Sequence, residues 1–445
     1  MDSYTRQSFI TDFRRSKELQ KISHQLIPGG AHTYAKGDDQ YPENAPAFIA
    51  RGKGCHVWDV DGNEYIEYGM GLRSVTLGHA YEPVVEAAYQ EMLKGINFTR
   101  PAPIEVECAE ELLSLIKGAE MVKFGKNGSD VTTAAVKLAR AHTGRDLVGI
   151  CVDHPFFSVD DWFIGATAMD AGIPEAVQQL TVQFRYNDLK SVKELFEQYP
   201  DQIACLIMEP EKYDPPVDNF LHETMRLCHQ NGALFILDEI ITGFRHDLGG
   251  AQNLYDIVPD LSTFGKAIAN GFSVSALVGK KEFMEAGGLY HDKERVFLLS
   301  TTYGAETHGL AAAIATMEIF KEENVVDYLY YQGERLADGI NKLVDQLDMH
   351  GYFGVLGKPC NLVYYTRDQE KMPSQPYRTL FMQETIKRGL LMPSLILSYS
   401  HSDQDIDRTI EAIGDSLYVY RQALNEGIEK YLVGPSVKPV FRSRN

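Results

Sequence analysis

The sequence is poor in cysteine and has no long apolar run. Its six cysteines form no CxxC pair, and several lie in apolar stretches such as GICV and ACLIM, which predicts buried free thiols in a reducing compartment. No stretch reaches the roughly 18–20 apolar residues that cross a bilayer, and residues 1–15 lack the apolar core of a secretory signal. We therefore expect a cytoplasmic protein with no membrane partner.

Positive charge is scarce as well. The 43 lysine and arginine residues, against 62 aspartate and glutamate residues, give a net charge of −19 in a chain of 445 residues. This balance disfavours nucleic acid and anionic membranes as partners, but it is compatible with a local positive pocket for a small anion. The content of 44% hydrophobic and 24% charged residues is that of an ordinary folded protein and excludes bulk disorder.

Several standard motifs are also missing. Walker, HExxH and GxSxG motifs are absent, and no metal site is expected. Gly69-Met70-Gly71 lacks the third glycine of a dinucleotide fingerprint, which disfavours a nicotinamide-dependent dehydrogenase.

In the middle of the chain, short apolar runs alternate with amphipathic helical patterns. The runs are MVKFG (121–125), LVGICV (147–152), ACLIME (204–209), ALFILDE (233–239) and VSALVG (274–279). Strands that are apolar on both faces indicate an α/β fold with a mostly parallel central sheet covered by helices. Because such sheets bind ligands at the carboxyl ends of their strands, the chemistry should follow these runs.

The two ends of the chain are expected to form a second, smaller α+β domain. The predicted division is 1–75 and 321–445 for this small domain and 76–320 for the large one. Residues 54–68 read as a hairpin with an Asp-Gly turn, and a long helical stretch is expected from Thr307 to about Leu347. A further helix is expected from about Asp403, with a capping box of Ser402 and Asp405.

The segment 124–130, FGKNGSD, stands between a predicted strand and a predicted helix. Gly128 allows close approach of the backbone, and Ser129 offers a hydroxyl beside the free amides of a helix start, so together they predict a cup for a phosphate group. A capped helix after a glycine turn explains the same residues and remains an alternative.

Two further segments carry an isolated charge among apolar residues. Asp238 follows a buried strand, where a carboxylate needs a cationic or donating partner such as a protonated pyridine nitrogen. Capping of the next turn and an ion pair with Arg245 are the alternatives. Lys266 lies in STFGKAIANG, where desolvation would make its amine nucleophilic, although most lysines are surface charges. A phosphate cup, a carboxylate and an amine at strand ends match the needs of pyridoxal phosphate.

The chain resembles the class III, fold-type I, pyridoxal-phosphate-dependent aminotransferases, nearest to the glutamate-1-semialdehyde aminomutase-like branch. The resemblance covers roughly residues 25–420. It rests on IPGG (27–30), ARGKGCHVWDVDGNEYIEY (50–68), LGHAYEPVVEA (77–87), KLARAHTGRD (137–146), MEP (208–210), LDEIITGFR (237–245), FGKAIANGF (264–272) and TTYGAETHGLAAAIATMEIF (301–320). It implies the fold-type I architecture with pyridoxal phosphate as cofactor.

The resemblance also implies roles for single residues. Lys266 matches the lysine that binds the cofactor's aldehyde, and Asp238 matches the partner of its ring nitrogen. Gly128 and Ser129 correspond to the phosphate-binding Gly-Thr of the family. Thr302 matches a threonine that reaches the phosphate in the neighbouring subunit, which implies a homodimer with active sites at its interface.

Two more positions are assigned with an alternative beside them. Glu209 matches the Glu of the family's Glu-Pro segment, and a structural acid at a strand end is the alternative. His154 falls where the family stacks a Tyr or Phe on the cofactor ring, in a segment that reads Asp153-His154-Pro155. An ordinary loop histidine is the alternative at that position.

The sequence departs from the aminomutases near the expected substrate. The arginine expected after IPGG is absent, and Lys36 is a poorer bidentate partner for a carboxylate. The acid expected after Met392-Pro393-Ser394 is absent too. Arg73 is a candidate for a donor carboxylate, with a surface ion pair as its alternative.

These departures point to transamination from a donor such as glutamate to an aldehyde or ketone in a ping-pong cycle. Aromatic and acidic residues in segments 32–42 and 153–165 resemble those of enzymes that aminate oxo-sugars, which suggests a role in amino sugar biosynthesis. In this interpretation aromatic rings pack on sugar faces (Tyr34 and Trp162) and carboxylates accept sugar hydroxyls (Asp38, Asp39 and Asp160), and the alternative is that these residues build the dimer interface. An aminomutase acting within one molecule is the main alternative, and a non-catalytic cofactor-binding regulator is another.

Overall fold

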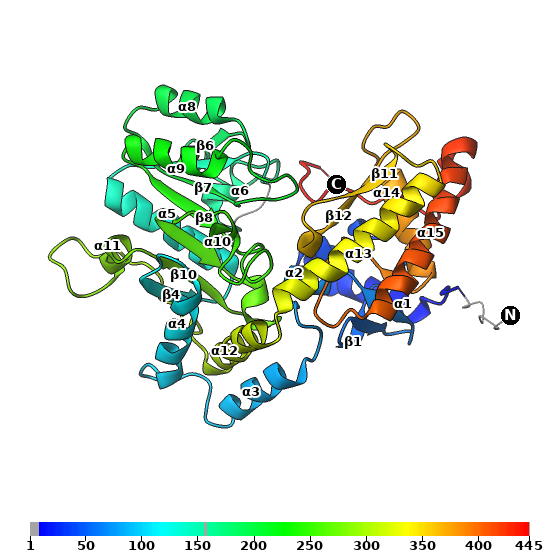
Figure 1. The fold of residues 1–445 in the computed structure, drawn as a ribbon, viewed down its shortest axis with the longest axis horizontal. Helices are drawn as coiled ribbons and strands as arrows, with labels where there is room; N and C mark the ends of the chain where they lie inside the picture. Colours follow the sequence, from blue (N-terminus) through cyan, green and yellow to red (C-terminus); the bar gives the residue numbers. More distant parts are fainter. Residues whose placement is uncertain (1–8, 155–157, 445) are drawn as a thin grey trace. The chain divides into compact units, whose positions relative to one another are not determined.

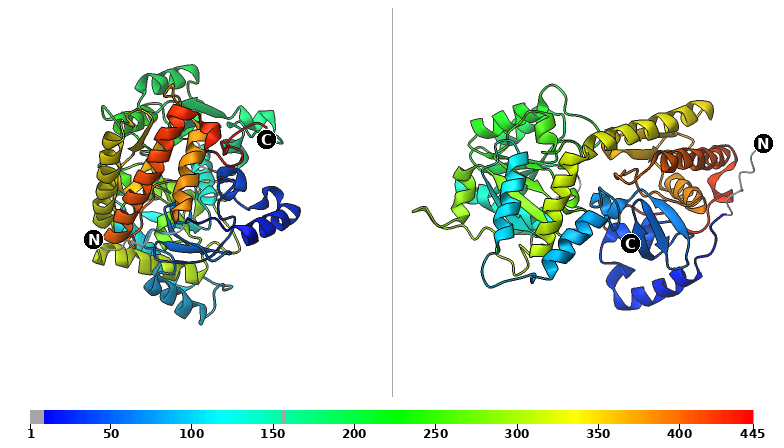
Figure 2. Two further views of the ribbon diagram at one scale, coloured as in Figure 1. Left: turned by 90° about the vertical axis from the view of Figure 1, so that its right-hand side faces the viewer. Right: turned by 60° about the horizontal axis from the view of Figure 1, so that its bottom comes forward.

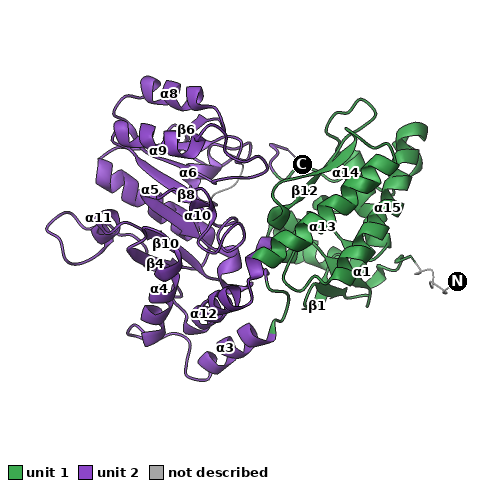
Figure 3. Cartoon of the chain, in the orientation of Figure 1, with its two compact units in different colours: residues 1–71, 77–81, 327–440 green, residues 72–76, 82–326, 441–445 purple. Residues whose placement is uncertain are grey.

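The computed structural model describes residues 9–154 and 158–444, which fold into two compact units (Figure 3). Unit 1 comprises residues 1–71, 77–81 and 327–440, and unit 2 comprises residues 72–76, 82–326 and 441–445. Residues 1–8 of the predicted small domain and residues 155–157 of the segment 153–165 lie outside the described residues. The boundaries predicted after residues 75 and 320 remain predictions beside this division.

Unit 2 is built around a mostly parallel sheet, and its α/β architecture agrees with the predicted fold class (Figure 1). The strands are β4 (Met121–Gly125), β5 (Leu147–Cys151), β6 (Thr181–Phe184), β7 (Ile203–Met208), β8 (Leu234–Asp238), β9 (Leu261–Phe264) and β10 (Ser275–Gly279). They lie in the order β4-β10-β9-β8-β7-β5-β6, and β10 runs antiparallel to both of its neighbours. Each predicted apolar run forms one of these strands.

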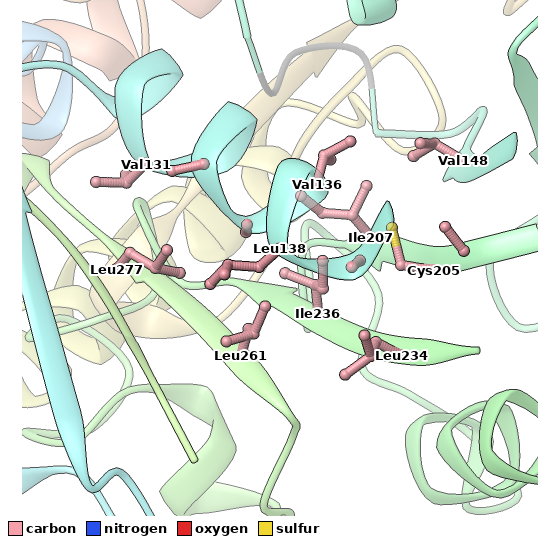
Figure 4. Packing of buried hydrophobic residues seen from close by; sticks show 14 of the residues in the cluster. Val131, Val136, Leu138, Val148, Cys205, Ile207, Leu234, Ile236, Leu261 and Leu277 are labelled. Atoms are coloured by element: carbon pink, nitrogen blue, oxygen red, sulfur yellow. The ribbon is translucent and has the colours of Figure 1, made fainter. Parts of the chain in front are cut away.

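Helices cover both faces of this sheet (Figures 1 and 2). The helices of unit 2 are α3 (Glu82–Met92), α4 (Pro103–Leu115), α5 (Gly128–Thr143), α6 (Asp161–Ile164), α7 (Glu175–Gln178), α8 (Leu189–Gln198), α9 (Phe220–Gln230), α10 (Ala251–Leu254), α11 (Lys281–Met284) and α12 (Thr307–Glu322), of which α3 packs on α12. Along β8, Leu234 and Ile236 face the core under α5, whereas Phe235 and Leu237 face the core under α8 and α9 (Figure 4). This alternation explains why the strands read as continuous apolar runs.

Unit 1 contains a sheet in the order β1-β2-β3-β13 and a two-stranded sheet of β11 and β12. The strands are β1 (Ile49–Lys53), β2 (His56–Asp59), β3 (Glu64–Glu67), β11 (Phe353–Leu356), β12 (Val363–Thr366) and β13 (Leu390–Leu391). The helices are α1 (Arg14–Leu26), α13 (Val325–Gln346, beginning in unit 2), α14 (Gln375–Lys387) and α15 (Asp403–Glu426), of which α14 and α15 pack together (Figure 2). The predicted hairpin and the Ser402–Asp405 capping box are confirmed.

One predicted element is wrong. The long helix expected from Thr307 to about Leu347 is two helices, α12 and α13, which are separated at Glu323 and Asn324. Asn324 has a φ of 49°, a left-handed conformation that ends a helix and that asparagine tolerates better than most residues.

All six cysteines are buried and free, as expected. Among the described residues, no helix combines the length and the apolar composition that a bilayer span requires.

Candidate active site

The strand register brings the predicted amine and carboxylates to one edge of the unit 2 sheet. The parallel strands β7 and β8 pair Met208 with Leu237, so Glu209 and Asp238 come next on neighbouring strands. Lys266 comes shortly after the end of β9, which runs parallel to β8. The charges of Glu209, Asp238 and Lys266 act on one another, so the structure brings these three predicted residues together.

Asp238 is buried at 3% exposure and uses one carboxylate oxygen for its hydrogen bonds. Its Oδ1 accepts from the amide of Ile240 at 3.0 Å and from the hydroxyl of Thr263 at 3.0 Å. Burial raises the pKa of Asp238 to about 6, against the effect of the Ile240 amide and of Lys266. The cap of the next turn is therefore present, whereas no ion pair with Arg245 is found in the described part of the chain. Oδ2 stays available to a ligand.

Lys266 is partly buried and stands in a conformation that is unusual for a lysine. Its φ is 40°, in the left-handed region that L residues avoid, and such strain clusters at functional sites. Desolvation lowers its pKa, while Asp238 and Glu209 act in the opposite direction without a hydrogen bond to its amine. An amine with a lowered pKa is more often uncharged, and an uncharged amine is the nucleophilic form.

Glu209 is 4% exposed, and its Oε2 is buried without a hydrogen-bond partner among the described residues. Burial raises its pKa to about 7, and Lys212, Lys266 and Arg73 act against this rise. A carboxylate that serves only to stabilise a strand end would be satisfied by nearby donors, because buried polar atoms rarely lack partners. The unpartnered oxygen therefore favours a role toward a ligand.

The phosphate cup predicted from the sequence falls on the loop between β4 and α5. The amides of Gly128 and Ser129 open α5 and have no acceptor within the helix, while Asp130 accepts from the amides of Lys126 and Asn127 at 3.0 and 2.9 Å. Ser129 is buried, and its hydroxyl accepts from the amide of Val159 at 2.9 Å. The loop is thus both a capped helix start and a set of free amides, so neither interpretation excludes the other.

A side chain at position 128 would collide with the segment that follows Asp238. A Cβ on Gly128 would lie 2.6 Å from Cδ1 of Ile240, whose amide bonds Asp238. The glycine therefore lets the loop approach the carboxylate segment closely.

His154 lies just beyond β5 and is 2% exposed. Its ring stands 4.9 Å from the ring of Tyr186, whose hydroxyl donates to the carbonyl of Pro210 at 2.8 Å. Burial lowers the pKa of His154 to about 3, with a further contribution from Lys212, so the imidazole is neutral. A flat neutral ring beside the Glu209–Pro210 segment is compatible with stacking on a ligand.

Thr302 is exposed, and its carbonyl accepts from Nδ2 of Asn97 at 3.1 Å. Contacts within this chain therefore do not bring it to the other predicted site residues.

Sequence reasoning missed part of the site. Lys212 follows the Glu-Pro segment, and desolvation lowers its pKa although Glu209 acts against this. Arg73, considered only as a candidate, is half-buried and its charge acts on Glu209 and Lys266. The charge of Arg245 acts on Lys266 as well. Several cations thus lie near the two predicted carboxylates.

Two residues expected at a sugar surface are structural. Trp162 is 6% exposed, belongs to the core under α5, and donates from Nε1 to the hydroxyl of Thr133 at 2.8 Å. Asp160 accepts from the hydroxyls of Thr133 and Ser158. The prediction that Trp162 packs on a sugar is wrong, because its apolar surface is used up in the core.

Comparison with known proteins agrees with this site. The family model of the class-III aminotransferases matches residues 38–393. The chain is 32% identical over 424 residues to the glutamate-1-semialdehyde 2,1-aminomutase of Francisella philomiragia, covering 89% of this chain and 96% of the relative. It is 32% identical over 420 residues to the 3-aminobutyryl-CoA aminotransferase of Cloacimonas acidaminovorans, covering 92% and 98%.

The fold has close relatives among solved structures. A structure of the Sphingopyxis FumI protein with pyridoxal phosphate is 26% identical, has a TM-score of 0.84, and aligns over 93% of this chain and 98% of that one. The chain belongs to the class-III aminotransferase family, the pyridoxal-phosphate-dependent transaminases and aminomutases of fold type I.

The residues of the site fit pyridoxal phosphate. The amine of Lys266 has no hydrogen bond, and one oxygen each of Asp238 and Glu209 is left without a donor among the described residues. The free amides at the start of α5 suit a phosphate. An amine after β9, an acid at the end of β8 and an anion cup after β4 are the kinds of group that this cofactor requires.

Proposed function

We propose that this chain transfers an amino group from a donor such as glutamate to an aldehyde or ketone in a ping-pong cycle, with Lys266 and Asp238 as its catalytic residues. The observation that carries the proposal is the meeting of one amine and two carboxylates, all desolvated and none ion-paired with another described residue, at the carboxyl edge of the sheet. Charges are left in this state where a ligand completes them.

The chemistry divides between the cofactor and the chain. Pyridoxal phosphate supplies an aldehyde and an electron sink when it is bound. Asp238 would hold the ring nitrogen through its carboxylate and would keep that nitrogen protonated. Lys266 Nζ would hold the aldehyde and, once released, would move the proton at the donor's α-carbon. Because desolvation lowers the pKa of Lys266, more of its amine is uncharged and able to accept a proton.

The remaining predicted residues orient the cofactor in this proposal. Gly128 and Ser129 bind its phosphate with the amides of α5, His154 stacks on its ring, and Glu209 borders it. Thr302 contributes to the phosphate site of a second copy of the chain, which its exposure supports.

We propose a homodimer for a second reason. Helix α3 and the segment after it expose a run of large apolar side chains, which marks an interaction surface. These are Val85, Tyr89, Met92, Leu93, Ile96 and Phe98.

The acceptor is proposed to be an oxo-sugar, with amino sugar biosynthesis in the cytoplasm as the setting. The absence of the aminomutase arginine after residues 27–30, the exposed Tyr34 and the six free thiols support this proposal. The alternative is intramolecular transfer of the glutamate-1-semialdehyde type, which the 32% identity to the aminomutases favours. A panel of oxo-sugars and oxo-acids separates them, because an aminomutase isomerises its substrate without net consumption of glutamate.

The central test identifies the residue to which the cofactor is attached. Borohydride reduction of the holoenzyme, followed by peptide mass spectrometry, should find the B6 adduct on Lys266 and none on Lys212, the other desolvated lysine of the site. Glutamate should then release 2-oxoglutarate from the unreduced enzyme. An adduct elsewhere, or no adduct after saturation with the vitamer, would contradict the proposal.

A further inference from the structure

The segment Met70–Arg73 (α2) is a left-handed helical turn. Its four residues have φ values of 41°, 57°, 58° and 74°, while their hydrogen bonding is that of a helix. L residues avoid this conformation because Cβ approaches the following carbonyl oxygen, and Gly71 is the one residue of the four that takes it without cost. Three strained residues within one turn persist only where the surrounding structure enforces their conformation.

Arg245 is one of the residues that enforce this conformation. It is the largest side chain of the described part of the chain that is fully buried, with 0% exposure. Its Nη2 donates to the carbonyl of Arg73 at 3.3 Å and to the hydroxyl of Thr76 at 2.9 Å. Thr76 is itself fully buried. A buried guanidinium is costly, so its use to hold a backbone carbonyl in the turn points to a function for the turn.

Arg245 is joined rigidly to the catalytic segment. It lies seven positions after Asp238 in the same loop. In this loop the amide of Gly243 donates a hydrogen bond to the carbonyl of Glu239 at 2.7 Å. The carboxylate of Glu239 accepts from the amides of Ala251 and Gln252 at 2.9 and 2.6 Å and so closes the loop. The position of the turn is therefore fixed relative to the strand that carries Asp238.

The turn determines where the guanidinium of Arg73 stands. The charge of Arg73 acts on Glu209, Lys212 and Lys266. The guanidinium of Arg73 is therefore near the amine of Lys266, the group proposed to react. A guanidinium is a planar fork that matches a carboxylate bidentately.

We propose that Arg73 binds a carboxylate of the amino donor and that Arg245, Thr76 and the left-handed turn are a positioning device that holds its guanidinium in the site. The proposal rests on the proposed transaminase function. It assigns the missing carboxylate-binding role to a different part of the chain from the segment after residues 27–30. It also gives the strained turn a purpose, since a right-handed turn would aim the side chain of Arg73 elsewhere.

Binding of glutarate, a dicarboxylate without an amino group, to the holoenzyme tests this proposal by calorimetry. Arg73→Gln should raise the Kd for glutarate at least about tenfold, because a charge-assisted bidentate contact is lost. Thr76→Val removes the hydroxyl but keeps the shape, and it should raise the Kd by about three- to tenfold. Thr76→Ser keeps the hydroxyl and should restore binding to within about twofold of the wild type.

A second pair of variants tests the turn itself. Leu72→Ile adds a β-branch, which resists a positive φ, so it opposes the left-handed turn and should raise the KM for glutamate while kcat changes by less than about threefold. Leu72→Gly takes a positive φ without cost, so it should leave the KM within about twofold of the wild type. This split between KM and kcat is not expected from a general loss of folding.

The outcomes separate the two proposals. Suppose that the wild type binds glutarate and releases 2-oxoglutarate from glutamate, and that Arg73→Gln does both equally well. The role proposed for Arg73 is then wrong, and the transaminase proposal stands. If Thr76→Val binds glutarate as the wild type does and Leu72→Ile keeps the wild-type KM for glutamate, the positioning device is wrong. If the wild type neither binds glutarate nor consumes glutamate, both the donor assignment and this inference are wrong.

Discussion

Two clusters of ionisable side chains, one in each unit, hold their charges in opposite ways. In unit 1, His56 places Nδ1 2.8 Å from Oε1 of Glu64 and Nε2 3.0 Å from Oδ1 of Asp405. In unit 2, no ion pair joins Lys266 to Asp238 or Glu209 in the described part of the chain, although the three charges act on one another. The first cluster is held by ion pairs, and the second has none among the described residues.

The pKa directions follow this difference. In unit 1, the hydrogen bond with Asp405 raises the pKa of His56. Burial opposes it, but hydrogen bonds from His56 and Ser402 lower the pKa of Asp405, so both groups favour their charged forms. In unit 2, desolvation raises the pKa of Asp238 and Glu209 and lowers that of Lys266, so the charged forms are disfavoured. Paired charges stabilise the fold, whereas desolvated charges without partners mark a place for a ligand.

Removal of the amine should have the largest effect. Lys266→Ala is expected to lower the rate of 2-oxoglutarate release by at least about 10⁴-fold, because the proton carrier and the cofactor attachment are both lost. Thermal unfolding should stay near that of the wild type, since the lysine forms no ion pair and its φ of 40° is strained. Rates like those of the wild type in this variant would refute the catalytic role.

Replacement of the buried carboxylate should have the next largest effect. Asp238→Asn is expected to lower kcat on the order of 10³-fold, because an amide does not keep the ring nitrogen protonated. The matched control is Asp260→Asn, just before β9, because Asp260 is equally buried but is satisfied by Lys280 at 2.8 Å and by the amide of Phe235 at 2.8 Å. The control should lose stability and keep its kcat within a few-fold; a loss below about tenfold in Asp238→Asn would argue against the role.

Much of this arrangement was predictable from local sequence. The strand from 121 to 125 and the inner face of α5 followed from apolar periodicity, because a sheet covered on both sides needs continuous apolar strands. Asp238 and Lys266 were predictable because a single charge in an apolar run is costly to bury unless it has a partner or a function. Such signals are carried by a few neighbouring residues and survive without tertiary information.

The rest depends on contacts between distant residues. The left-handed turn at Met70–Arg73 contains one glycine, and its other residues do not favour a positive φ, so the conformation comes from the bonds to Arg245. The burial of Trp162 depends on Thr133, which lies on another element. Nothing in the sequence around Lys212 marks it as part of the site, because its desolvation is set by the fold around it.

One histidine in each unit allows the same comparison through the pH dependence of the free energy of unfolding. Burial lowers the pKa of His154 to about 3, from an ordinary value of 6.5. The unfolded chain therefore binds the proton first, and the folded state loses stability as the pH falls from 6.5 toward 3, by about 1.4 kcal/mol per pH unit. His154→Phe removes this loss, so urea unfolding at pH 4.5 with saturating pyridoxal phosphate should show a relative gain of about 2–3 kcal/mol over pH 7.5. An unchanged pH dependence would mean that the folded state accepts the proton on this ring.

His56 should respond with the opposite sign and a smaller effect. Its pKa is raised in the folded state, so the stability it contributes is fully present below pH 6.5 and is lost as the pH rises through the folded value. His56→Gln should therefore cost about 1–2 kcal/mol in urea unfolding at pH 5.5 and less at pH 8.5, without a change in kcat. An equal loss at both pH values would show that the imidazole acts through packing, and a fall in kcat would show that the unit 1 cluster is not merely structural. Opposite pH trends in His56→Gln and His154→Phe would establish that one protein contains a histidine held charged for its fold and another held neutral at its site.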